Sequence, residues 1–376
     1  IGPKLDAGTF VAPTEPGQDV DGIKWYERIP TEGGKLGYAG YSLFYAVADV
    51  TLESPGNLIL RSDRMYQTYL NGLPQPGDPY ATRSHRTPGP AHQGSNTLVG
   101  MAYMAVNDPE LEVYYAPDEV YFNLLDVTAP DLVVGQKEEQ WLGVALLNLT
   151  EKALTPAIAK VIESERFEAT EVVYPALAPS ALTQLGFKLI PKAAPTAAGE
   201  AWSVQLRLEA KGLEWSYETK VELPTVAPNV PYKRSRRSNV DHSVQYAGIN
   251  PASSTDSTGG QALVLSLHGA GVQGIGQAQA YSAKEWAWLV APTNRRPFGF
   301  DWEEWGRLDG IEALDDALSN LPVDPTRVYV TGHSMGGHGT WQFGVLFPDR
   351  FRVVGPSAGW SSFYSYGGAA APTGPV

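Results

Sequence analysis

Short runs of β-branched and aromatic residues, often alternating with polar positions, dominate the chain between residues 38 and 223. Clear examples are LFYAVADVTL, EVYYAPDEVYFNLL, WLGVALLNL and WSVQLRLEA, and clusters of Gly, Pro, Asn and Asp separate them. Alternation of this kind is typical of antiparallel sandwiches, in which one face of a sheet meets the core and the other meets water. The pair Asn71 and Gly72 also predicts a tight turn. We therefore expect this part of the chain to be mostly β.

The segment DVTAPDLVVG separates stretches of about 125 and about 95 residues, and each of them suits one sandwich. We predict a first sandwich over residues 1–128 and a second over residues 129–226. The next segment is rich in Pro and in basic residues, which predicts a linker over residues 227–242. An anion site or a protease site in the run from Lys233 to Arg237 is the alternative to a solvated linker.

From residue 243 the pattern changes to buried-type strands that alternate with helical segments, which is typical of a mainly parallel α/β sheet. Strands are expected at ALVLSL, AWLVAP, RVYVTG and RFRVVG. Asp301 is predicted to cap one helix together with Glu304, and this helix should end before Pro322. Its apolar positions at helical spacing are Trp305, Leu308, Ile311, Leu314, Leu318 and Leu321. The predicted fold class is therefore multidomain, with two sandwiches followed by an α/β unit over residues 243–376.

The composition narrows the classes of function. With 376 residues and 43% hydrophobic content, the chain can bury a large core in two or three domains. Its formal net charge of -13 would repel a nucleic acid or an anionic bilayer, and no segment is apolar enough for a membrane span. The absence of cysteine excludes disulfides and thiolate metal sites, and no His, Asp and Glu spacing predicts a metal or a cofactor. The chain begins at Ile1 rather than Met, so a signal peptide is either absent or already removed.

The stretch RVYVTGHSMGGHGTWQFGVLF carries a Gly-x-Ser-x-Gly motif centred on Ser334. The pentapeptide alone is weak evidence, because the chain contains 39 glycines and a second copy centred on Ser357. A nucleophilic serine on a sharp elbow also needs a strand before it and a helix after it. Ser334 has both, whereas WSSFYSYGG after Ser357 has poor helix propensity. We predict that Ser334 is the nucleophile and that Ser357 lies in a loop at a strand end.

An oxyanion hole needs two N–H donors, one from the residue after the nucleophile and one from the loop after an earlier strand. The run LVLSLHGAG supplies such a loop upstream of Ser334. We assign the donors to the amides of Met335 and Ala270, with Gly271 as the substitute for Ala270. An ordinary turn at a strand end is the alternative interpretation of this loop.

The histidines next to Ser334 in the sequence are poor candidates for the general base. His333 lies beside the serine in a turn that directs neighbouring side chains apart, and His338 lies one helical turn later, where packing or capping is expected. Three others fall in β-rich or linker regions, namely His85, His92 and His242.

The segments LSLHGAG, VAPTNRRPFGFDWEEWGRLDGIEAL, VDPTRVYVTGHSMGGHGTW and FPDRFRVVGPSAGW together resemble the α/β-hydrolase superfamily. The resemblance is to the catalytic domains of prolyl-oligopeptidase-like peptidases and related secreted bacterial esterases, and it covers roughly residues 243 to 362. It implies a nucleophile at Ser334, oxyanion amides at Ala270 and Met335, and a substrate cleft bordered by residues 300–305. The side chains assigned to this cleft are His268, Phe300, Asp301 and Trp302.

The preceding half is similar to a galactose-binding-type jelly roll followed by an immunoglobulin-like sandwich. This resemblance allows a glycan at the first sandwich, but a packing or spacing role fits equally well, because fold alone does not assign function.

The sequence departs from the hydrolase pattern in one respect. In this fold an acid and a histidine follow the nucleophile, and no histidine occurs after His338. We expect both groups, with further strands of the hydrolase domain, in a longer polypeptide beyond residue 376. Without them RFRVVG would be an apolar edge strand that is open to pairing or aggregation.

Two hypotheses follow for the function. The first is a secreted, periplasmic or cell-surface serine hydrolase that cleaves carboxylic esters or peptides through an acyl-enzyme, with the rest of the hydrolase domain as its partner. The second is a non-catalytic carbohydrate-binding or surface-assembly protein with a dead hydrolase scaffold. No blade-length repeat of the propeller that accompanies prolyl oligopeptidases is present, which favours an esterase.

Overall fold

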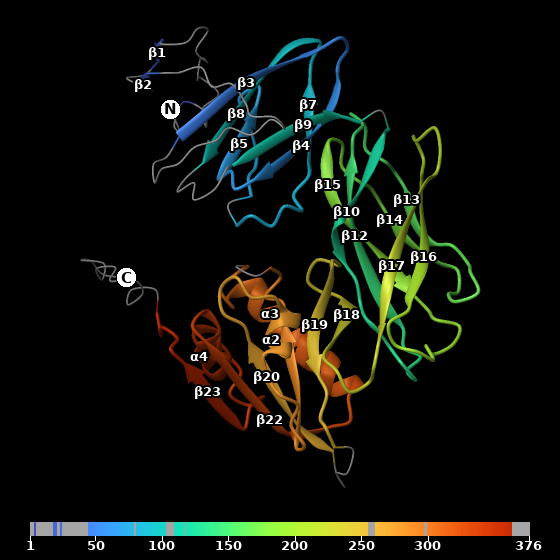
Figure 1. The fold of residues 1–376 in the computed structure, drawn as a ribbon, viewed down its shortest axis with the longest axis vertical. Helices are drawn as coiled ribbons and strands as arrows, with labels where there is room; N and C mark the ends of the chain where they lie inside the picture. Colours follow the sequence, from blue (N-terminus) through green and yellow to red (C-terminus); the bar gives the residue numbers. More distant parts are fainter. Residues whose placement is uncertain are drawn as a thin grey trace.

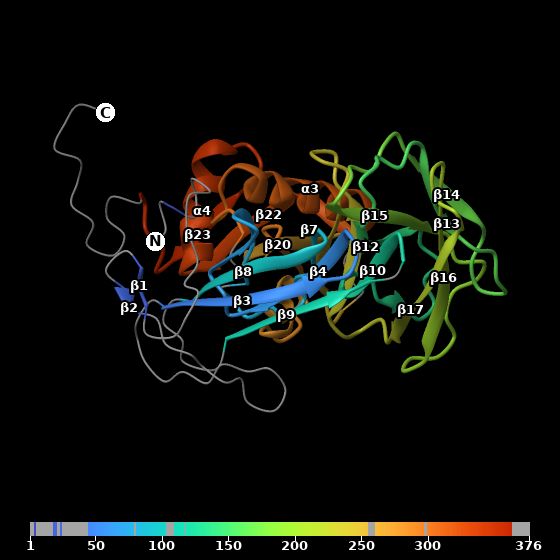
Figure 2. The same ribbon diagram turned by 90° about the horizontal axis from the view of Figure 1, so that it is seen from above.

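The computed structural model describes residue 4 and residues 18–20, 23–24, 44–78, 80–102, 109–116, 118–254, 260–296 and 299–362. Most of the regular structure in these residues is β-sheet (Figure 1). Two pairs of sheets, coloured blue to teal and green, precede a mixed sheet with helices, coloured yellow to red; Figure 2 shows the same elements from above. A two-stranded sheet lies near the N-terminus and consists of β1 (Asp19–Val20) and β2 (Ile23–Lys24).

Apolar residues from both sheets hold the first pair together. Leu58 and Leu60 of one sheet share a buried cluster with Leu70 of the other. The strand orders are β3-β8-β5-β6 and β7-β4-β9. The turn predicted at Asn71 and Gly72 is confirmed, because these residues join β5 to β6 with φ angles of 51° and 79°. The strands are β3 (Phe44–Leu52), β4 (Gly56–Asp63), β5 (Gln67–Leu70), β6 (Leu73–Pro76), β7 (Thr87–Ala91), β8 (Gly94–Ala102) and β9 (Glu110–Tyr115).

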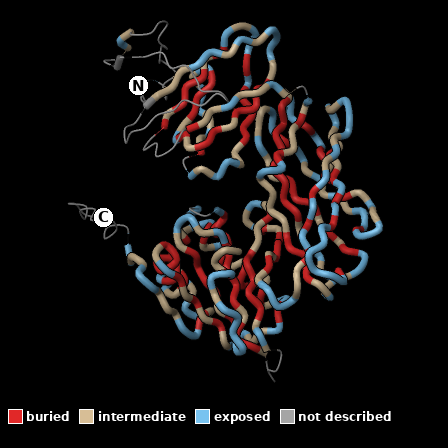
Figure 3. Tube along the Cα trace, viewed as in Figure 1, coloured by how far each residue is buried: buried red, intermediate tan, exposed pale blue. Residues whose placement is uncertain are grey.

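The second pair of sheets encloses a larger core. Leu142 and Phe187 of one sheet share a buried cluster with Leu206 and Leu208 of the other, and Figure 3 shows buried positions along these strands. The strand orders are β10-β12-β15 and β11-β17-β16-β13-β14. The strands are β10 (Val120–Thr128), β11 (Leu132–Val133), β12 (Gln140–Asn148), β13 (Ala157–Val161), β14 (Thr170–Tyr174), β15 (Ala181–Leu189), β16 (Ala201–Ala210) and β17 (Tyr217–Val226).

The mixed sheet has the order β18-β19-β21-β20-β22-β23. Its last four strands in the chain run parallel to one another. The strands predicted at ALVLSL, AWLVAP and RVYVTG are confirmed as β20 to β22, and the strand predicted at RFRVVG is confirmed as β23 from Val353 onward. Helices connect these parallel strands, as such a sheet requires. The elements are β18 (Tyr232–Arg237), β19 (Val244–Asn250), β20 (Gln261–Leu267), α2 (Gly274–Gln279), β21 (Ala287–Pro292), α3 (Glu304–Asn320), β22 (Val323–His333), α4 (Met335–Leu346) and β23 (Val353–Ser357).

Helices cover both faces of this mixed sheet. Ala278 of α2 packs against Leu289 and Ala291 of β21, whereas Val290 between them belongs to the cluster that contains residues of α3 and α4. Neighbouring residues of a strand point to opposite faces, so α2 covers one face and the other two helices cover the opposite face. The parallel strands β20 and β22 pair through Leu267 and Gly332, which places the segments that follow them at the same edge of the sheet.

Strand β10 belongs to the second pair of sheets, although the sequence pattern predicted a boundary at residue 128. It pairs with β12, and Val120 and Phe122 pack into the second core. The segment after residue 128 is therefore the crossing from one sheet of the second pair to the other, because β11 joins the sheet of β17. A Pro-containing turn looks the same in the sequence whether it lies between two units or inside one.

The structure also places a strand where a linker was predicted over residues 227–242. Strand β18 pairs with β19 along its whole length, and Arg234, Ser235 and Arg236 are buried. Arg234 pairs with Asp316 of α3, and Arg236 pairs with Asp309 of the same helix. Basic residues can be buried here because each guanidinium meets a carboxylate.

Helix α3 is confirmed, and Ile311, Leu314, Leu318 and Leu321 of its predicted apolar positions lie in the core or pack against it. Its predicted cap and the other two apolar positions are wrong. Glu303 rather than Asp301 precedes the first helical residue, and no side chain caps this end. Trp305 and Leu308 are 44% and 39% exposed. The buried positions are Gly306, Asp309, Gly310, Ala313, Leu314 and Ala317. Gly306 lies against Asn294 and Gly310 against Phe343 of α4, so small residues stand where the helix is closest to its neighbours.

Candidate active site

The turn between β22 and α4 holds Ser334 in an unusual backbone conformation, with φ of 57° and ψ of -120°. A positive φ at a residue other than glycine costs about 1–3 kcal/mol and persists only where neighbouring structure enforces it. Here the Ser334 N–H donates to the carbonyl of Ser357 at 3.0 Å, and the Ser334 carbonyl accepts from the N–H of His338 at 3.0 Å. The side chain is half-buried, and its hydroxyl makes no hydrogen bond with any described residue.

Close backbone contacts explain two of the glycines around Ser334. A Cβ on Gly336 would lie 2.0 Å from the carbonyl oxygen of Leu267, and a Cβ on Gly332 would lie 2.3 Å from that of Gly336. Both distances are clashes with backbone atoms, so a larger residue would separate α4 from the sheet. The glycines therefore allow the close approach of strand and helix that the sequence predicted.

The loop after β20 lies against this elbow. A Cβ placed on Gly269 would be 3.9 Å from the Cβ of Ser334, and a bond of 3.2 Å from the Val272 N–H to the Gly269 carbonyl closes the loop. The amides of Ala270 and Met335 have no acceptor among the residues that the structure describes. The Met335 amide is in the first turn of a helix, where N–H groups have no partner inside the helix. The structure thus brings the predicted donor loop to the predicted nucleophile.

His268 and Trp302 do not line a cleft, and the sequence prediction for these two side chains is wrong. Both are 0% exposed. The His268 ring lies between two carbonyl oxygens, with Nδ1 2.9 Å from Gly269 and Nε2 3.0 Å from Thr293. Trp302 donates its indole N–H to the His268 carbonyl at 3.0 Å. These two rings support the donor loop from inside instead of facing a substrate.

Phe300 and Asp301, which precede the buried Trp302 in the sequence, remain accessible to solvent. Phe300 is 42% exposed and lies 6.0 Å from the ring of Trp305. Asp301 is half-buried, and burial raises the pKa of its carboxyl, although His338 opposes this shift. Their assignment to the border of a cleft stays a prediction.

His333 and His338 are engaged by other groups, in line with the expectation that neither is the base. The exposed His333 has its Nδ1 3.2 Å from the hydroxyl of Ser357. The buried His338 has its Nδ1 2.9 Å from the Trp360 carbonyl and its Nε2 3.0 Å from a carboxylate oxygen of Glu303. His338 is therefore a packing residue that fastens α4 to the loop before α3.

The described residues contain no group of three or more His, Asp and Glu side chains that could hold a metal ion. Among the helices of the described part of the chain, none combines the length and the apolar character needed to cross a bilayer.

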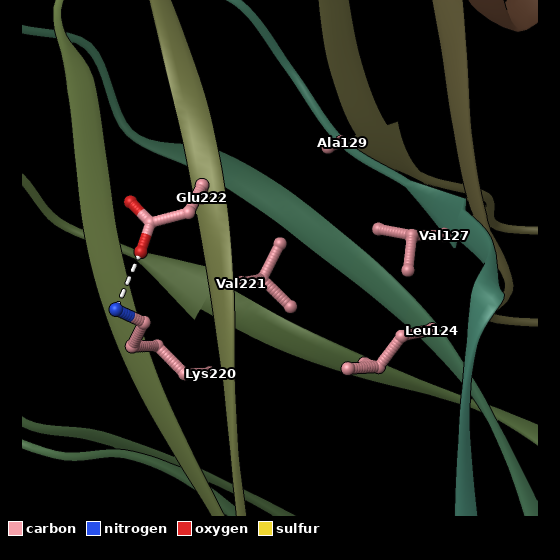
Figure 4. Close-up of a pocket in the computed structure, with 6 residues that line it drawn as sticks. All are labelled: Leu124, Val127, Ala129, Lys220, Val221 and Glu222. Atoms are coloured by element: carbon pink, nitrogen blue, oxygen red, sulfur yellow. Dashed lines mark ion pairs between the residues drawn. The ribbon is translucent and has the colours of Figure 1, made fainter.

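A hollow of about 330 Å³ lies in the second pair of sheets, away from Ser334 (Figure 4). Leu124, Val127 and Ala129 line one side, and Lys220, Val221 and Glu222 line the other. Its two charged side chains form an ion pair, in which Nζ of Lys220 lies 2.8 Å from a carboxylate oxygen of Glu222. This lining offers no nucleophile, so the hollow is not part of the candidate site.

Sequence reasoning missed a buried charge network beneath the donor loop. Arg236 pairs with Asp309, whose second carboxylate oxygen accepts from both the N–H and the hydroxyl of Thr293. The spacing of the arginines and aspartates in the sequence could have indicated this network. Arg234 and Arg236 are two residues apart, as on one face of a strand, and Asp309 and Asp316 are seven apart, as on one face of a helix.

Comparisons with known proteins relate parts of this chain to hydrolases. No protein-family model matches the sequence. An S-formylglutathione hydrolase of Paracoccus denitrificans is 28% identical over 22% of this chain and 29% of its own length, and poly(3-hydroxyalkanoate) depolymerase C of Paucimonas lemoignei is 32% identical over 26% and 27%. An uncharacterized secreted protein of Arthroderma benhamiae is 29% identical over 33% of this chain and 15% of its own length.

The chain spans less than a third of the length of these curated relatives. Among solved structures, an S-formylglutathione hydrolase from Staphylococcus aureus aligns with a TM-score of 0.29 and 14% identity over 35% of this chain and 57% of that one. One of the sequence relatives is named a hydrolase and another a depolymerase, so the similarity in sequence supports a hydrolase in general terms.

Proposed function

We propose that this chain carries the nucleophile and the oxyanion hole of an α/β-hydrolase-type serine hydrolase that cleaves carboxylic esters. The observation that carries the proposal is the strained serine between β22 and α4, with the loop of Gly269 against it. In this function the Ser334 hydroxyl attacks the ester carbonyl, the alcohol leaves, and water releases the acid from the acyl-enzyme. The amides of Met335 and Ala270 donate to the oxyanion of the tetrahedral intermediate, with Gly271 as the substitute for Ala270.

The proposed mechanism also needs a histidine that takes the proton from Ser334 and an acid that orients this histidine. The described residues offer no such base, because the Ser334 hydroxyl has no hydrogen-bond partner among them. In the hydrolases that the sequence resembles, both groups follow the nucleophile along the chain. A nucleophile without its base retains only the residual rate enhancement of the oxyanion hole and of substrate binding.

The sequence relatives support an ester rather than a peptide as the substrate. Two of them are named S-formylglutathione hydrolase and poly(3-hydroxyalkanoate) depolymerase C, and neither name describes a peptidase. The relative from Arthroderma benhamiae is named as secreted, which supports our proposal of a location outside the cytoplasm. Glycan binding by the first pair of sheets stays a prediction that an array of neutral glycans would test.

A fluorophosphonate probe tests the proposal on the natural full-length protein, because it labels only serines that are activated as nucleophiles. We expect labelling of the wild-type protein, its loss in Ser334→Ala and its retention in Ser357→Ala. The second variant is a matched control, since Ser357 is the centre of the other Gly-x-Ser-x-Gly copy and lies at the end of β23. Peptide mapping of the labelled site by mass spectrometry checks the assignment.

A non-catalytic binding or surface-assembly protein is the second candidate function. The lack of a base next to Ser334 in the described residues favours it. A folded full-length protein that no fluorophosphonate labels would establish this alternative and exclude the hydrolase. Labelling that persists in Ser334→Ala would also exclude our assignment of the nucleophile.

A further inference from the structure

A buried ion pair joins the edge strand β18 to helix α3 and has no part in the proposed chemistry. Arg236 is almost fully buried, Asp309 is 0% exposed, and the guanidinium donates to a carboxylate oxygen and, at 2.8 Å, to the backbone carbonyl of Asp309. A buried ion pair is weak evidence for stability, because desolvation of the two charges offsets much of their attraction. The geometry around the pair indicates a more specific role.

The second carboxylate oxygen of Asp309 continues the network toward the donor loop. It accepts the N–H of Thr293 at 3.2 Å and the hydroxyl of Thr293 at 3.1 Å. The carbonyl of the same threonine lies 3.0 Å from Nε2 of His268. His268 immediately precedes Gly269, which lies against Ser334. A continuous set of buried contacts therefore leads from Arg236 to the loop that carries the Ala270 amide.

The His268 ring makes the loop sensitive to this network. Its Nδ1 lies 2.9 Å from the Gly269 carbonyl, while its Nε2 faces Thr293. A neutral imidazole has a single N–H, so it donates to one of these carbonyls and not to both. The position of the Thr293 carbonyl thus influences which nitrogen holds the proton and how the ring holds Gly269. Thr293 in turn is held by Asp309.

We propose that Arg236 and Asp309 are positioning residues, which fix the oxyanion donor of Ala270 relative to Ser334 through Thr293 and His268. This inference rests on the proposed serine hydrolase function and names a determinant of its rate. Oxyanion donors act only within a narrow range of positions, and a displacement of about 1 Å can cost about a hundredfold in rate. Loss of the Asp309 charge should therefore lower turnover more than it lowers substrate binding.

The chain offers a matched control pair on the same two elements. Arg234 lies two residues before Arg236 on the same face of β18, and its Nε lies 2.8 Å from a carboxylate oxygen of Asp316 on α3. Arg234 is also buried, and its partners are the carboxylates of Asp316 and Glu138. Unlike Asp309, neither of these carboxylates bonds to Thr293. Disruption of this pair should affect the attachment of α3 without moving the donor loop.

The test compares Asp309→Asn with Asp316→Asn in the natural full-length protein, with a small activated ester as the substrate. We expect Asp309→Asn to lower kcat by about tenfold to a hundredfold with less than about a threefold change in KM, because the donor rather than the binding surface is displaced. Asp316→Asn should keep kcat within about twofold of the wild type while its melting temperature falls. Equal kcat in the two variants would overturn the proposal.

Thr293→Val keeps the inference testable if Asp309→Asn does not fold. Valine has nearly the shape of threonine and leaves the Arg236–Asp309 pair intact. It removes the hydroxyl that donates to Asp309 and that also contacts Gln245 and the Arg295 N–H. We expect a severalfold lower kcat and altered ¹⁵N signals of the His268 ring, which report the nitrogen that holds the proton. Unchanged kcat and ring signals would overturn the proposal. Ester hydrolysis that survives Ser334→Ala would instead exclude the proposed function on which the inference rests.

Discussion

The ring of His268 is enclosed by Gly269, Thr293 and Trp302, and this enclosure determines its protonation. Burial lowers the pKa of His268 below its ordinary value of 6.5, because the imidazolium would lose its hydration. The contacts with the two carbonyls and the charge of Asp309 oppose this shift but are smaller. The ring is therefore neutral near pH 7.

We expect His268 to make the protein less stable in mild acid. The unfolded chain takes up a proton as the pH falls below 6.5, whereas the folded chain resists protonation down to its lowered pKa. The stability that this neutral ring contributes is therefore complete above pH 6.5 and is lost progressively below it. Denaturant unfolding of the wild type and of His268→Gln between about pH 7.5 and about pH 5 measures the effect. The wild-type advantage in unfolding free energy should shrink in acid, and a constant advantage would contradict the assignment.

The difference between Ser334 and His268 shows which residue-level properties the sequence can predict. Ser334 lies where a β-rich run meets glycines and a helix, so its conformation is encoded within a few residues. The burial of His268 depends on the Thr293 carbonyl, and that of Trp302 on the close approach of Gly339. These partners are far apart in the sequence, so the motif predicted the position of His268 correctly and its exposure incorrectly.

Helix α3 was predicted from the spacing of its large apolar residues, and those from Ile311 to Leu321 do meet the core, whereas small residues make its closest contacts. Gly310 packs so closely that a Cβ there would lie 2.4 Å from the ring atom Cζ of Phe343 in α4. Asp309 lies on the buried side because Arg236 pairs with it. A hydrophobic pattern predicts that a segment is helical. The exact rotation of the helix about its axis also depends on close packing and on an ion pair with a residue far away in the sequence.

Substitution of Gly310 tests this packing. Gly310→Ala should lower the unfolding free energy by up to about 2 kcal/mol, because the added methyl group overlaps the Phe343 ring at a cost of about 1–3 kcal/mol. The higher helix propensity of alanine, about 1 kcal/mol, offsets only part of this cost. Leu308→Ala on the exposed side is the control and should change the unfolding free energy by less than about 1 kcal/mol. Denaturant titration measures both values, and a stabilised Gly310→Ala variant would show that α3 packs less tightly than described.

Strand β18 connects the mixed sheet to the second pair of sheets through its two faces. Arg236 points to α3, whereas the neighbouring Ser235 bonds to β12. The Ser235 hydroxyl accepts the Trp141 N–H at 2.9 Å and donates to the Trp141 carbonyl at 2.6 Å. These groups lie on the edge of β12 beyond its last pair with β10, at Gly143. The sequence predicted a linker because its local composition is basic. Composition does not reveal that neighbouring side chains have partners on a helix of one unit and on a strand of another.

Two contacts between the same parts of the molecule should differ in strength. The first is the contact of Ser235 with Trp141, and the second is an ion pair at the surface, in which the two terminal guanidinium nitrogens of Arg296 each lie 3.1 Å from a carboxylate oxygen of Asp126. The Arg296 side chain is 58% exposed. Ser235→Ala should lower the unfolding free energy by about 1–3 kcal/mol, because it leaves the Trp141 peptide groups without partners. Arg296→Gln should lower it by less than about 1 kcal/mol, since water screens the pair. Denaturant unfolding of both variants decides the order, and a larger loss in Arg296→Gln would mean that surface charge, rather than β18, holds the mixed sheet to its neighbour.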